Sequence, residues 1–128
     1  MTYNFPKEER LHSKKLIQEL FEKGSSFYLY PFKVMCLPYE VEPTEKPVNQ
    51  FLVSVTKRKF KKAVDRNLIK RRIKEAYRLN KNLLLKIENQ PTSSLLIGLI
   101  YTGKEIHDSK MLDFRMKKVL SQLLKADI

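Results

Sequence analysis

The chain has 128 residues, a formal net charge of +12 and an apolar fraction of 42%. These values favour one globular domain with a single core and exclude a disordered chain. The longest apolar run, Leu95 to Tyr101, is far shorter than the roughly 20 residues of a membrane helix, and a single cysteine excludes an internal disulfide. We therefore expect a cytoplasmic protein without a secretory signal, folded as one domain over residues 1–128.

The start of the sequence predicts an extended arm followed by a helix. Pro6 disfavours a helix in residues 1–10, so we expect this segment to form the arm. Ser13 is a suitable N-terminal cap, and Gly24 lies where a helix commonly ends. The sequence therefore predicts a helix that runs through about Lys23.

Two segments of alternating polarity predict strands on either side of a loop. The alternation covers residues 32–37, where Cys36 would be a small core residue, and then residues 51–56. Between them, residues 38–47 are acidic and contain prolines, so we expect a surface loop there.

The second half predicts a long helix, a turn, a buried strand, a loop and a final helix. The long helix is expected over 64–87, the turn over 90–94, the buried strand over 95–102 and the loop over 103–108. Ser109 would cap the final helix. The last helix carries an apolar stripe at helical spacing, formed by Met116, Val119, Leu120 and Leu123. This order of elements predicts an α+β fold in which helices cover a small sheet.

The positive charge is concentrated in one segment. Residues 57–81 hold twelve basic and two acidic side chains, which give a net charge of +10 out of the total of +12. On a helical wheel, Ile69, Ile73 and Ala76 share a side that would pack on the sheet. Another side carries a polar set, made of Asn67, Lys70, Arg71, Lys74, Arg78 and Lys81.

Repulsion along this polar side favours a polyanionic partner. Like charges four residues apart on a helix, such as Lys70 and Lys74, destabilise the helix unless an anion neutralises them. Nucleic acid fits best, because phosphate contacts gain affinity from counterion release. A solvated helix face and an anionic membrane are the alternatives. DNA stays open as well, although the lack of paired zinc ligands and of a leucine heptad excludes zinc fingers and basic zippers.

No group of side chains has the spacing of a catalytic or metal site. His12 and His107 are isolated in the sequence, and the acidic residues of 38–47 lie in a predicted loop, where a precise metal site is difficult to build. We therefore expect neither a catalytic residue nor a metal ligand in this protein, which would instead position a nucleic acid and screen its charge.

The basic segment contains a motif that resembles the signature of the bacterial ribonuclease P protein subunit. The matching residues run from Lys62 to Tyr77 as KAVDRNLIKRRIKEAY, and their core is Arg66-Asn67, Lys70-Arg71 and Ile73-Lys74-Glu75-Ala76. The strand before it, residues 52–58, and the N-terminal pieces 10–11 and 21–25 resemble the same family.

This resemblance implies an αβββαβα sandwich with a left-handed crossover around the long helix, contrary to the usual right-handed rule. It implies a cytoplasmic accessory protein of the ribonucleoprotein that removes the 5′ leader from precursor tRNA. The RNA subunit would perform this endonucleolytic cleavage and bind most of the Mg²⁺, and neither DNA nor a membrane would be a partner. The alternative is a structural RNA-binding protein of ribosomal or RNA-chaperone type.

The resemblance also implies two binding surfaces. The catalytic RNA would contact Arg66, Asn67, Lys70, Arg71, Lys74, Arg78, Lys57 and Arg58. A cleft between the first helix and the sheet would hold the leader at Ile17, Phe21 and Met35. Relatives commonly carry aromatic residues at the positions of Ile17 and Met35, whereas Phe21 keeps its ring. Asp65 and Arg72 share a side of the wheel, where a weak ion pair is conceivable.

Overall fold

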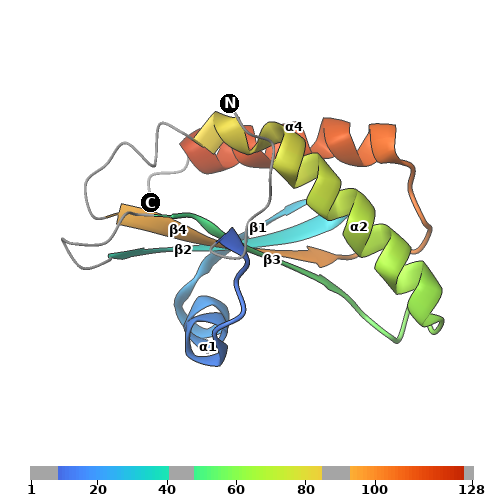
Figure 1. The fold of residues 1–128 in the computed structure, drawn as a ribbon, viewed down its shortest axis with the longest axis horizontal. Helices are drawn as coiled ribbons and strands as arrows, with labels where there is room; N and C mark the ends of the chain where they lie inside the picture. Colours follow the sequence, from blue (N-terminus) through green and yellow to red (C-terminus); the bar gives the residue numbers. More distant parts are fainter. Residues whose placement is uncertain (1–8, 41–47, 85–92, 126–128) are drawn as a thin grey trace.

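A β-sheet separates one helix from two others (Figure 1). The computed structural model describes residues 9–40, 48–84 and 93–125. In chain order its elements are α1 (Lys14–Lys23), β1 (Ser25–Leu29), β2 (Phe32–Glu40), β3 (Gln50–Val55), α2 (Ala63–Asn80), the 3₁₀ helix η2 (Lys81–Leu84), β4 (Ser93–Tyr101) and α4 (Ser109–Lys125). The predicted α+β class and the αβββαβα order are confirmed.

The sheet combines antiparallel and parallel pairing. Within the described residues it has four strands, in the order β1-β2-β4-β3. β2 pairs antiparallel with both β1 and β4, whereas β3 pairs parallel with β4. α2 lies in the connection between these parallel neighbours and crosses one face of the sheet beside α4, while α1 covers the other face (Figure 1).

The larger core lies between the sheet and the helices α2 and α4. Its α2 side is the one that the wheel predicted, because Ile69 and Ile73 are fully buried and Ala76 nearly so. All the stripe residues of α4 are fully buried in the same core. Cys36 lies there as a free thiol whose pKa is raised by burial, so it packs as a small apolar residue and is not activated as a nucleophile.

A smaller core lies under α1. Ser13 caps this helix as predicted, since its Oγ accepts a hydrogen bond of 3.3 Å from the Leu16 N–H, and Gly24 follows the last turn. Leu20 is fully buried above Gly98 of β4, where a Cβ atom would come within 3.0 Å of the Leu20 side chain. The glycine therefore lets α1 approach the sheet closely.

β2 is longer than predicted. Residues 38–40 continue the strand and pair with β4, so the prediction of a loop from residue 38 is wrong at its start. β1 pairs with β2 only as far as Cys36. Pro38 therefore lies where β4 is the only described neighbour of β2, a position at which a missing N–H is tolerated. The rest of the predicted loop, residues 41–47, lies outside the described residues, as do residues 1–8 of the predicted arm.

α2 is shorter than predicted. The helix ends at Asn80 and the chain continues as η2, while residues 85–87 lie outside the described part of the chain. The Asn80 amide donates to the Ala76 carbonyl at 2.8 Å and to Asp113 Oδ1 of α4 at 2.7 Å. Side-chain bonding to the preceding turn competes with continued helix, so it favours an end at this residue.

Two boundaries in the last third also differ from the prediction. β4 begins at Ser93, inside the predicted turn 90–94, of which residues 90–92 are not described. α4 is capped by Asp108 and not by Ser109, because Asp108 Oδ1 accepts a hydrogen bond of 2.9 Å from the Met111 N–H. Ser109 is already the first helical residue, one position beyond the cap.

Candidate nucleic-acid interface

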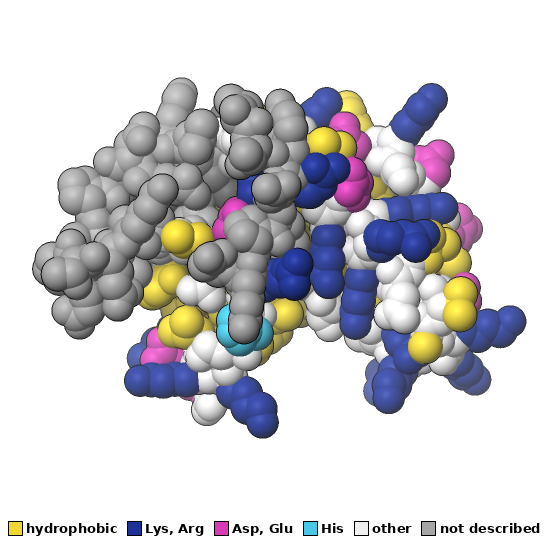
Figure 2. Space-filling view, in the orientation of Figure 1, with side chains coloured by type: hydrophobic (Ala, Val, Ile, Leu, Met, Phe, Trp, Pro, Cys, Tyr) yellow, Lys and Arg dark blue, Asp and Glu magenta, His cyan; other side chains and the backbone are white. Residues whose placement is uncertain are grey.

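The outer side of α2 forms a cationic surface. A cavity of about 310 Å³ on this side is lined by Asn67, Lys70, Arg71, Lys74, Glu75 and Arg78. All six come from successive turns of one helix whose opposite side is buried, so the core fixes the direction in which this side faces. Figure 2 shows Lys and Arg side chains gathered over α2. The structure thus brings together five of the eight residues predicted to contact the catalytic RNA.

One acidic residue interrupts the cationic lining. Glu75 forms an ion pair with Arg78, in which Arg78 Nε donates to Glu75 Oε2 at 3.2 Å and Arg78 Nη2 contacts the other carboxylate oxygen. The hydrogen bond from Arg78 lowers the pKa of Glu75, so this carboxylate stays ionised in mildly acidic solution. Arg78 is therefore partly neutralised by its own helix before any anion binds.

Arg66 has a structural contact that the sequence did not indicate. Its Nη1 donates to the Phe60 carbonyl at 2.7 Å and to the Lys61 carbonyl at 2.9 Å. Phe60 is buried in the larger core, so these bonds fasten the segment between β3 and α2 to the start of the helix. Arg66 lies at the N-terminal end of the cationic surface, outside the lining of the cavity.

The cations next to α2 divide into exposed and paired groups. Lys57 and Arg58 are exposed in the turn that follows β3. Lys81, which the wheel placed on the polar side, lies in η2 and forms an ion pair with Glu9 at 2.8 Å. Lys57 and Arg58 thus extend the cationic surface upstream, whereas Lys81 fastens the N-terminal segment.

The weak ion pair of Asp65 with Arg72 that the helical wheel allowed is not formed. Arg72 Nη1 instead donates to the His107 carbonyl at 2.8 Å, in the loop before α4. Asp65 lies in the first turn of α2, two turns away from Arg72, and an acidic residue is favourable at that end of a helix. Arg72 therefore holds the loop of 103–108 against α2.

The predicted leader-binding residues lie on or under α1, and they differ in exposure. Ile17 is half-buried against the smaller core, and the Phe21 side chain is 45% exposed. Met35 is only 7% exposed because it packs on Leu20 and neighbouring residues beneath the helix. The structure therefore offers Phe21 and the edge of Ile17 to a ligand, with Met35 as support below them.

The two histidines have structural partners. His12 Nδ1 lies 2.8 Å from the Arg10 carbonyl, and His107 Nε2 lies 3.1 Å from the Tyr30 hydroxyl. Among residues 9–40, 48–84 and 93–125, no group of three His, Cys, Asp or Glu side chains is placed to hold a metal ion. No helix in the same ranges is long and apolar enough to cross a membrane.

The fold and the surface together define a small α+β domain that displays a cationic helix on one face of a sheet and an amphipathic helix on the other. A family model described as Ribonuclease P matches residues 5–124. The chain is 32% identical over 123 residues to the ribonuclease P protein component of Porphyromonas gingivalis, covering 95% of this chain and 88% of that protein. It is 32% identical over 117 residues to the same component of a Picosynechococcus species, covering 91% of each chain. The chain belongs to the ribonuclease P protein component family, as its motif indicated.

Solved structures agree with this fold. The RNase P protein of Staphylococcus aureus superimposes with a TM-score of 0.64 at 19% identity, covering 90% of this chain and 94% of that one. The RNase P protein of Thermotoga maritima gives a TM-score of 0.64 at 20% identity, with coverage of 89% and 96%. The arrangement of helices and strands is thus shared with experimentally determined members of the family.

Proposed function

We propose that this chain is the non-catalytic protein subunit of ribonuclease P, which assists the removal of 5′ leaders from precursor tRNA. The catalytic RNA would bind the cationic surface of α2, and the RNA would carry out the cleavage with Mg²⁺. In this proposal no step of the chemistry is assigned to residues of this chain.

The observation that carries this proposal is the cavity on α2. Four cations and Asn67 converge on one rigid surface that contains a single acidic residue, Glu75. Such a surface matches a phosphate backbone, because each neutralised phosphate releases counterions and each amide or guanidinium donor can fix an oxygen. Lys57 and Arg58 would extend the contact along the same RNA.

The 5′ leader is proposed to lie beside α1. Phe21 offers an aromatic face to an unpaired base, and Ile17 offers apolar contact next to it. Because Met35 is covered, it would keep α1 at its distance from the sheet and would not stack with the leader itself.

The test is a cleavage assay with the matching RNA subunit. Precursor tRNA is cleaved at low Mg²⁺ with and without the purified protein, and the protein is expected to raise the rate. A Lys70→Gln, Lys74→Gln double variant should stimulate less, whereas Lys104→Gln, which removes a cation from an exposed loop elsewhere, should behave as the original protein. No stimulation by the original protein, together with tight binding to unrelated RNA, would instead support a structural RNA-binding protein.

The leader contact has its own test. Phe21→Ala should weaken binding of leader-bearing precursor tRNA more than binding of mature tRNA. Ile106→Ala, which truncates a comparably exposed apolar residue in the loop before α4, serves as the control. Equal losses for both RNAs in Phe21→Ala would assign Phe21 to the support of α1 and not to the leader.

A further inference from the structure

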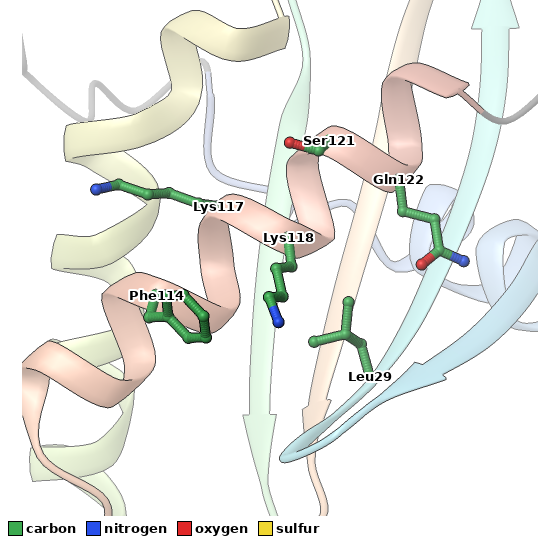
Figure 3. A pocket seen from close by; sticks show the side chains of 6 residues that line it. All are labelled: Leu29, Phe114, Lys117, Lys118, Ser121 and Gln122. Atoms are coloured by element: carbon green, nitrogen blue, oxygen red, sulfur yellow. The ribbon is translucent and has the colours of Figure 1, made fainter.

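A second hollow lies on α4, away from the surfaces assigned above. Its volume is about 520 Å³, and its lining consists of Leu29, Phe114, Lys117, Lys118, Ser121 and Gln122. Leu29 comes from the end of β1 and the other five from α4 (Figure 3). The wall is mainly apolar, with lysine and amide groups at its rim. We refer to this hollow as the α4 pocket.

Phe114 is the central feature of the α4 pocket. Its side chain is 54% exposed, so much of the ring is accessible to a ligand. Lys118 Nζ lies 4.5 Å from the centre of the ring, and the Arg115 guanidinium carbon lies 5.9 Å from it. In Figure 3 the Lys118 side chain extends between Phe114 and Leu29. An aromatic face and a cation are thus presented to one volume.

We propose that the α4 pocket binds one nucleotide of single-stranded RNA, with its base against Phe114 and Leu29 and its phosphate at Lys118. Base stacking on an exposed aromatic ring is tolerant of sequence, and a nearby lysine supplies the charge for the backbone. The Gln122 amide, which lies beside Leu29 in Figure 3, can pair with a base edge. This site goes beyond the proposed function, which places RNA only on α2 and beside α1.

A further hollow between the α2 cavity and the α4 pocket favours RNA as the ligand of the α4 pocket. Its volume is about 480 Å³, and it is lined by Leu79, Asn80, Asn82, Leu83, Lys117 and Ser121. It shares Lys117 and Ser121 with the α4 pocket, and its Leu79 is the next residue in the chain after Arg78 of the α2 cavity. An RNA strand that lies on α2 can therefore continue over the ridge of α4 and reach Phe114.

Charge argues against the other occupants. A second copy of the chain would bring another net charge of +12 to a lysine-bearing surface. A membrane needs a broad apolar face, whereas here a single exposed phenylalanine and a half-buried leucine provide the apolar contact. An extended polyanion with planar groups satisfies both the ring and the cation.

The experiment is a titration of the isotope-labelled protein with a ten-nucleotide oligoadenylate. Binding is monitored through the NMR chemical shifts of the backbone amides. The shifts of residues 114–122 are expected to saturate. Phe114→Leu, which keeps the apolar bulk, should raise the dissociation constant from these shifts by about fivefold or more, the lower end for loss of one stacked base. Lys118→Gln should also weaken binding at residues 114–122. The matched control Lys110→Gln, an exposed lysine of the same helix outside the pocket, should change it by less than about twofold.

Four outcomes would overturn the proposal. The first is that the oligonucleotide shifts only residues of α1 and α2. The second is equal weakening by Lys118→Gln and Lys110→Gln, which would indicate unspecific charge. The third is that shifts in α4 follow protein concentration without RNA, which would assign the pocket to a second copy. The fourth is that vesicles of anionic phospholipid shift α4 while the oligonucleotide does not. Signals from α2 in the same spectra report independently on the proposed function.

Discussion

The ring of Tyr77 on α2 stacks on the ring of Phe51 on β3, with centroids 4.0 Å apart and planes only 5° apart. Both side chains are almost fully buried. The stack joins the helix to the strand that precedes it, near the end where α2 gives way to η2. It therefore helps to set the rotation of α2 about its axis, and with it the direction of Lys70 and Lys74.

Tyr77→Leu should lower the free energy of unfolding by about 1–3 kcal/mol, because it removes the stack and leaves a cavity in the larger core. Urea denaturation followed by circular dichroism measures this change. Tyr28→Leu removes an exposed tyrosine of β1 and should change stability by less than about 0.5 kcal/mol. Equal stabilities of the two variants would contradict a structural role for the stack.

Arg66→Ala should affect both stability and RNA binding. Loss of the bonds to the Phe60 and Lys61 carbonyls should lower the free energy of unfolding by about 1 kcal/mol, a modest value because one of the bonds is exposed. Arg71→Ala, on the exposed side of the same helix, should reduce RNA affinity with little loss of stability. Urea denaturation and RNA titration of both variants separate the two effects. If Arg71→Ala proves as destabilising as Arg66→Ala, the fastening role of Arg66 is wrong.

Glu75→Gln should strengthen binding to the catalytic RNA by about two- to fivefold, because it removes the carboxylate from the cavity and, with it, the ion pair to Arg78. The pKa of Glu75 is lowered, so its ion pair is fully formed above the carboxyl group's ordinary pKa and is lost only as pH falls through the lowered value. The gain should therefore be constant between about pH 8 and about pH 5.

Binding measured across that pH range checks this prediction. Glu22→Gln, the same charge change on α1, is the control and should leave affinity for the RNA subunit nearly unchanged. A gain for Glu75→Gln that disappears by about pH 5 would show that the carboxylate is already protonated there.

Two glycines should respond differently to alanine. At Gly98 the added Cβ would meet the end of the Leu20 side chain at 3.0 Å, and at Gly24 it would overlap the Leu20 carbonyl oxygen. A side-chain end can move more easily than backbone, so Gly98→Ala should cost about 1 kcal/mol and Gly24→Ala about 2–3 kcal/mol. Thermal unfolding of both variants measures the order. The reverse order would contradict the contact that places α1 on the sheet.

Local patterns in the sequence predicted the elements whose formation depends on near neighbours. The helical spacing of Ile69, Ile73 and Ala76 identified the buried side of α2, and that in turn left the cationic side facing outward. The end of α2 could not be predicted in this way, because Asn80 bonds to Asp113 on another helix. The sequence contains both residues but no signal that they meet.

Side-chain contacts with backbone carbonyls could not be predicted from the sequence either. The role of Arg66 depends on where the Phe60 and Lys61 carbonyls point, which no residue pattern reports. Strand alternation predicted that Met35 and Cys36 lie on opposite faces of the sheet, but it could not show that α1 covers Met35. Phe114 was not among the predicted site residues, and its position off the apolar stripe and close to two lysines is the signal that could have indicated it.

The N-terminal segment also affects how the protein behaves before it meets RNA. β3 is the last strand of the described sheet, and its outer edge would be open to pairing with another chain. Arg10 forms a parallel bridge with Phe51 at this edge, the Leu11 N–H donates to the Phe51 carbonyl at 3.0 Å, and the ion pair of Glu9 with Lys81 fixes the segment in place. Residues 9–11 thus cover the outer edge of β3 near its start, where they would hinder the addition of a strand from another chain.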